Sequence, residues 1–101
     1  MKKEFLVVFE IGKSSLGASA PDIPGCFAVG PTLDETRRRY LEAVEAHLKW
    51  LAADRDPLPE PATTHFDFAP RTKKEKPRYY VEWLQVPVPQ RLSPRKAKRA
   101  A

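Results

Sequence analysis

The chain has 101 residues and a mass of 11.5 kDa, which is the size of one small domain and excludes a multidomain enzyme. Hydrophobic residues make up 42% and charged residues 31%, as in ordinary globular proteins, while the 11 prolines are about twice the average share. Its single cysteine excludes an internal disulfide framework and a cysteine-rich zinc site. No apolar run is long enough for a signal peptide or a membrane span, so we expect a soluble cytoplasmic protein.

The net charge of +5 hides a difference between the two ends of the chain. Residues 1–70 carry eight Lys/Arg and eleven Asp/Glu, whereas residues 71–101 carry ten Lys/Arg and two Asp/Glu. An acidic body favours a basic partner, and a basic end favours contact with phosphate groups.

The first predicted strand covers 5–11, which is rich in β-branched and aromatic residues. Period-two alternation places four apolar side chains on one face: Phe5, Val7, Phe9 and Ile11. The Gly-Lys-Ser-Ser sequence at 12–15 predicts a turn. A short second strand of small residues is expected over 16–20.

The next segment, Pro21-Asp22-Ile23-Pro24-Gly25, is expected to form a tight connection. Both prolines fix φ, and glycine can adopt a positive φ. A third strand is predicted over 26–30.

The clearest local signal is the start of a helix. Thr32 followed three residues later by Glu35 is a capping box, and Asp34 adds a favourable charge to the first turn. The predicted helix has one apolar stripe, formed by Leu33, Tyr40, Val44, Leu48 and Leu51. Residues 54–57 are expected to end it.

After the helix, Pro57, Pro59 and Pro61 predict an extended, polyproline-like crossover. The segment 65–68 is compatible with a short edge strand, and 71–77 is expected to form a charged loop. A fourth strand is predicted over 78–86.

Catalytic groups are scarce. His47 and His65 are the only histidines, and a pair of Cys26 with His47 is better explained by packing, because the cysteine lies in an apolar strand and the histidine flanks the helix's apolar stripe. The carboxylates considered for a metal-dependent nuclease are scattered over a strand end, a turn and an edge: Glu10, Asp22 and Asp67. We therefore predict no catalytic, metal or cofactor site.

Two basic segments are candidates for nucleic-acid binding. Residues 37–39 are three arginines spread around the helix circumference, which favours a solvated surface over a phosphate clamp. The C-terminal tail over 90–101 is expected to be disordered when unbound. Its cations are sufficient for sequence-independent contact with nucleic acid, although a solvated tail is the alternative: Arg91, Arg95, Lys96, Lys98 and Arg99.

In order, several segments resemble the N-terminal domain of HicB-family antitoxins over about residues 4–62. They are Phe5-Leu-Val-Val-Phe-Glu, Pro21-Asp-Ile-Pro-Gly-Cys26, Gly30-Pro-Thr-Leu-Asp-Glu35, Glu42-Ala-Val-Glu-Ala-His-Leu48 and Leu58-Pro-Glu-Pro61. The resemblance implies an α+β domain of β-β-β-α-β order, a partial RNase H-like fold without its catalytic carboxylates. One helix would pack on a mixed sheet, with the last strand parallel to the first after a right-handed crossover.

The activity implied by the resemblance is to bind a small, basic HicA-type mRNA interferase and to mask its RNA surface or catalytic histidine. HicB antitoxins usually continue into a DNA-binding domain, and nothing after residue 89 has the pattern of one. We therefore expect a short stand-alone form with a domain over 1–89, whose crossover covers 57–77, and a basic tail over 90–101. The alternative function is non-sequence-specific nucleic-acid binding through that tail.

Self-association is predicted from the sheet itself. One helix covers one sheet face, yet the other face of the first strand carries Leu6 and Val8, and the last strand is apolar on both faces. A second copy of the chain, the toxin, or the 57–70 segment folding back would cover the second face. A homodimer or higher homo-oligomer is the favoured expectation.

Overall fold

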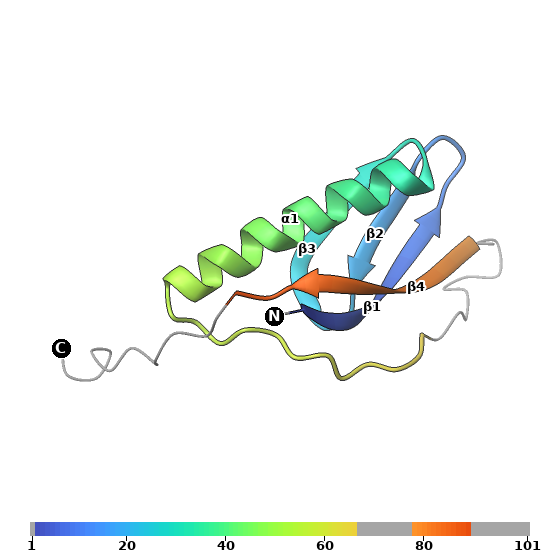
Figure 1. Cartoon of the computed structure of the whole chain (residues 1–101). Coiled ribbons are helices and arrows are strands. Elements are labelled where there is room, and N and C mark those ends of the chain that lie inside the picture. The colour runs from blue at the N-terminus through green and yellow to red at the C-terminus, as the bar shows by residue number, and fades with distance from the viewer. Residues whose placement is uncertain (1, 67–77, 90–101) are drawn as a thin grey trace, which may run out of the picture.

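The computed structural model describes residues 2–66 and 78–89. Its elements are β1 (Lys2–Ile11), β2 (Leu16–Ala20), β3 (Ile23–Gly30), α1 (Leu33–Ala53) and β4 (Arg78–Pro87). The strands form a four-stranded sheet of order β3-β2-β1-β4, and α1 lies across one of its faces (Figure 1). The predicted α+β class and element order are confirmed.

The hydrophobic core lies between α1 and the sheet. Phe5, Val7 and Phe9 of β1 are fully buried there, as their alternation predicted, whereas Ile11 at the strand end is only partly buried. From the helix, three residues spaced four apart are fully buried against them: Tyr40, Val44 and Leu48. The predicted apolar stripe is therefore the face that α1 buries.

The helix begins where the capping box predicted. Thr32 is the N-cap, and its Oγ1 accepts a hydrogen bond from the Glu35 backbone N–H at 3.1 Å. The buried Thr36 hydroxyl donates to the Thr32 carbonyl at 2.6 Å. A Cβ at Gly30 would lie 2.6 Å from Thr36 Oγ1, so only glycine allows β3 to end this close to the helix.

The last strand runs in the opposite direction to the one predicted. β4 is antiparallel to β1, with Phe5 opposite Leu84 and Phe9 opposite Tyr80. The other strand pairs are antiparallel as well. The expected mixed sheet, with a parallel last strand and a right-handed crossover, is therefore wrong.

The reason lies in the connection after α1. The helix ends near the beginning of β1, and a strand that started there would run parallel to it. Instead, Pro57–Phe66 runs back along the sheet, from Glu60 beside Lys3 near the start of β1 to Phe66 beside Tyr79, which faces Glu10 (Figure 1). Extended chain advances about 3.1–3.3 Å per residue, so this segment is about as long as β1. β4 therefore enters from the opposite end.

Element boundaries also differ around the proline turn. The turn consists of Pro21 and Asp22, while Pro24 and Gly25 already belong to β3. β3 is an edge strand, where a residue without a backbone N–H is tolerated. Gly25 has φ +83°, which confirms the predicted positive φ.

Other predicted segments have mixed outcomes. His65 and Phe66 are not in a strand, so the predicted edge strand is wrong at these residues. Its remainder at 67–68, the charged loop at 71–77 and the tail at 90–101 lie outside the described residues.

Gly25→Ala should lower the free energy of unfolding by about 1–2 kcal/mol, because an L-residue is strained at positive φ. Nothing lies within 4 Å of the added Cβ, so the cost comes from the backbone alone. Denaturant unfolding should show a smaller effect for Gly17→Ala, whose Cβ has its nearest contact at 3.9 Å and whose φ is not positive. Equal effects of the two substitutions would contradict this explanation.

Candidate functional site

The candidate site is the sheet face turned away from α1, here called the far face. Leu6, Val8 and Glu10 of β1 point to it, because they alternate with the buried core residues of the same strand. Strand register places further residues on this face: Gly17, Ser19, Phe27, Val29, Tyr79, Val81 and Trp83. A helix covers the opposite face, so the far face needs another cover.

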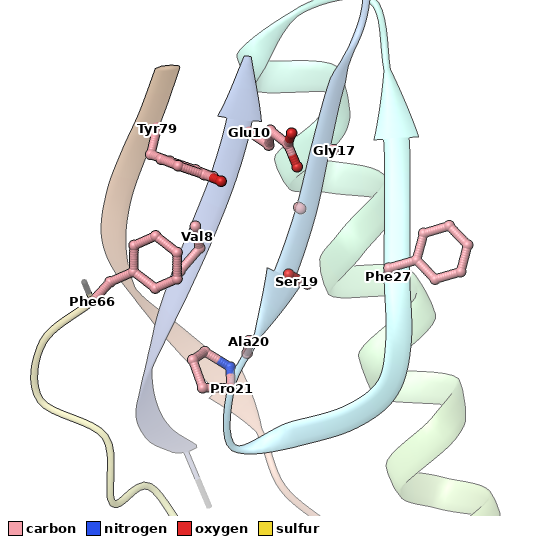
Figure 2. A pocket seen from close by; sticks show the side chains of 10 residues that line it. Val8, Glu10, Gly17, Ser19, Ala20, Pro21, Phe27, Phe66 and Tyr79 are labelled. Carbon is pink, nitrogen blue, oxygen red and sulfur yellow. The ribbon is translucent and has the colours of Figure 1, made fainter. Parts of the chain in front are cut away.

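The segment Pro57–Phe66, here called the strap, provides part of this cover. Phe66 lies beside Val8 (Figure 2), and its ring packs edge-on against Tyr79 with centroids 5.0 Å apart. Leu6 and Val8 are buried although they belong to the far face. Of the three candidates for covering the far face, the folded-back segment is therefore present at Phe66, whereas Leu58 near its start packs in the core between α1 and the sheet.

The strap is held by Asp22 at the turn between β2 and β3. Its Oδ2 accepts hydrogen bonds from the backbone N–H groups of Ala62 at 2.8 Å and Thr63 at 2.7 Å. Its Oδ1 accepts one from Thr63 Oγ1 at 2.8 Å. Desolvation acts to raise the pKa of Asp22, but these three bonds outweigh it, so the pKa lies below its usual value.

An open groove remains between the strap and β3. Its volume is about 420 Å³, and its floor is made of small residues, from Gly17 to Ala20. Phe66 and Tyr79 line the strap side, and Phe27 lies at the opposite rim (Figure 2). The groove is hollow because β2 has almost no side-chain bulk here.

Large apolar side chains remain uncovered on the far face. Phe27 is 71% exposed, Val29 48% and Trp83 46%. They belong to β3 and β4, the two edge strands of the sheet. Apolar residues concentrated on one face and both edges are typical of a surface that binds a partner.

The helix arginines are held in local ion pairs. Arg37 forms a bidentate pair with Glu82 of β4, with Nε–Oε1 and Nη2–Oε2 distances of 2.7 Å. Arg38 bonds to Glu35 and Glu42, and Arg39 to Glu35 and the Val29 carbonyl. The prediction that they form no phosphate clamp is consistent with this pairing.

Sequence reasoning missed the Arg37–Glu82 pair, which joins α1 to β4. Hydrogen bonding by Arg37 lowers the pKa of Glu82. The sequence signal for this pair is Glu82 itself, because it is a charged residue between Tyr80 and Leu84 on the strand face that packs toward the helix.

Cys26 and His47, the candidate thiol–imidazole pair, lie away from the far face. Cys26 packs in the core, and desolvation raises the pKa of its thiol, which disfavours a nucleophilic thiolate. His47 contacts Trp50 with ring centroids 6.4 Å apart. Within residues 2–66 and 78–89, no three His, Cys, Asp or Glu side chains are grouped for a metal ion. No described helix is long and apolar enough to cross a membrane.

The structure places the predicted turn and cap residues at the two ends of β3. Pro21, Asp22, Pro24 and Gly25 lie where β2 passes into β3, and Thr32 with Glu35 starts α1. The five predicted nucleic-acid contacts of the tail, from Arg91 to Arg99, lie outside the described residues.

A family model described as a HicB-like antitoxin of bacterial toxin-antitoxin systems matches residues 5–98. The chain belongs to the HicB-like antitoxin family. The resemblance found from the sequence segments is thereby confirmed. This family role agrees with a far face that has exposed apolar groups.

A curated protein is also similar to part of this HicB-like chain. It comes from Haemophilus phage HP1 (strain HP1c1), bears the name "Uncharacterized 14.9 kDa protein in rep-hol intergenic region", and is 40% identical over 42 residues. The match covers 42% of this chain and 32% of the phage protein, so the chain spans about a third of that relative. No solved structure matches the chain at a significant level.

Removing the Asp22 carboxylate should release the strap. Asp22→Ala should lower the free energy of unfolding at pH 7 by about 1–2 kcal/mol, a modest value because the site is close to solvent. Thr63→Val, which removes one of the three bonds, should cost less.

The effect of Asp22 should depend on pH. Because its pKa is lowered in the folded state, its stabilisation is complete above the unfolded value of about 3.9 and is lost as pH falls through the folded value. Urea unfolding of the wild type and of Asp22→Ala should be measured at several pH values. The difference between their free energies of unfolding should become smaller in acid. A difference that is constant down to pH 2 would contradict the assignment.

Proposed function

We propose that this HicB-like chain binds a small, basic HicA-type mRNA interferase and neutralises it. The observation that carries the proposal is the uncovered apolar surface of the far face on a chain of an antitoxin family. Membership of this family favours a regulatory role rather than an enzymatic one. Binding would act by masking the toxin's RNA surface or its catalytic histidine.

Charge supports a basic partner. The described residues carry nine Lys/Arg and eleven Asp/Glu. The helix arginines are already paired with carboxylates of the same chain, so they add little repulsion toward a cationic protein. Complementary charge would speed the encounter with a toxin that itself binds RNA.

Nucleic-acid binding through the tail stays a prediction from sequence. The charge division between the two ends of the chain favours it. Its cations are outside the described residues, so the structure adds nothing to this alternative.

Neutralisation is tested by growth of bacteria that express the toxin encoded beside this chain. Co-expression of the wild-type chain should restore growth, and the double variant Phe27→Ser, Trp83→Ser should restore it poorly, because it removes exposed apolar anchors of the far face. Trp50→Ser is the matched control, since Trp50 is 61% exposed on α1, on the other side of the sheet. Failure of the wild-type chain to restore growth or to bind the toxin would contradict the proposal.

The homodimer or higher homo-oligomer expected from the sequence stays a prediction. Among residues 2–66 and 78–89, β3 and β4 each have an outer side with no strand paired to it, so two copies are able to join edge to edge. Light scattering of the purified protein at micromolar concentration should give at least twice 11.5 kDa. A mass of one chain would contradict this prediction without affecting the proposed toxin binding.

A further inference from the structure

Glu10 is an acidic residue of the groove. It lies on β1 between Tyr79 of β4 and Gly17 of β2. Because glycine has no side chain, the Glu10 carboxylate is open toward the groove (Figure 2). It is exposed, and it has no hydrogen bond or ion pair in the structure described. An unpaired carboxylate at a hollow of the surface suits a cation from outside.

Aromatic rings flank the same groove. Phe66 and Tyr79 form one side, packed edge-to-face, and Phe27 stands at the other rim (Figure 2). The faces of aromatic rings attract ammonium and guanidinium groups. The small residues of the floor leave room for the aliphatic stem of a long side chain, which gains from apolar contact.

We propose that the groove receives a lysine or arginine side chain of the basic toxin, with Glu10 as its counter-charge. The inference rests on the proposed function and deepens it by naming the recognised group and its place. The carboxylate pairs with the cationic head, while Phe66 and Tyr79 contact the stem and the head group.

A second copy of the chain fits this groove less well. Along β1 the far face carries Glu10, Glu4, whose partner is the neutral Gln85 at 3.4 Å, and the exposed Lys2. The two carboxylates outnumber the one lysine on this face of β1, so a second far face carries the same excess of negative charge and is repelled. A basic protein carries the opposite charge and is attracted.

The test is a calorimetric titration of the full chain with the toxin whose gene lies beside its own. The toxin is inactivated at its catalytic histidine, and the salt concentration is the same in all titrations. Glu10→Gln should weaken binding about ten-fold and Glu10→Lys about a hundred-fold, because a charge pair is first removed and then made repulsive. Glu45→Lys is the control. It makes the same charge change on the exposed side of α1 and should alter affinity less than about three-fold.

The outcomes separate this inference from the proposed function. If the wild type binds and Glu10→Lys binds as Glu45→Lys does, the groove assignment is wrong while the antitoxin proposal stands. If the wild type does not bind the toxin, both are wrong. A wild-type dimer that Glu10→Lys dissociates would show that a second copy fills the groove, which also overturns the assignment. Thermal unfolding of each variant checks the fold, and Glu10→Gln carries the comparison if the lysine variant melts early.

Discussion

A four-stranded sheet with one helix has one face left to cover, and the rest of this structure depends on that constraint. α1 covers the face that carries Phe5, Val7 and Phe9. The strap returns along the other face, and Asp22 holds it there through three hydrogen bonds. The return also decides the direction of β4, because the chain reaches the far end of the sheet before the last strand begins.

The strap covers the far face only in part, and the uncovered part is the surface suited to binding a partner. The strap places Phe66 beside Val8 but leaves the small-residue floor of β2 open, with Glu10 at the groove and apolar groups on β3 and β4. Membership of the HicB-like antitoxin family places a toxin as the partner to consider. In the proposed complex, this surface would combine apolar contact, which supplies affinity, with the carboxylate of Glu10, which favours a basic side chain.

The sequence predicted local structure well, because local signals determine it. The alternation of β1, the Thr32 cap and the positive φ of Gly25 each follow from one residue type in one short pattern. The direction of β4 could not be predicted this way, because a polyproline-like segment is compatible with a short crossover and with a return along the whole sheet. Asp22 was recognised as a turn residue, but its role depends on backbone groups of the strap that no local pattern brings near it.

Hydrogen–deuterium exchange of the full chain, alone and with the inactivated toxin, tests most directly the claim that the far face binds the partner. The account predicts that toxin slows amide exchange in β2, β3 and the strap, and leaves the exposed side of α1 between Glu35 and Lys49 unchanged. Protection confined to α1, with none in β2 or β3, would contradict it.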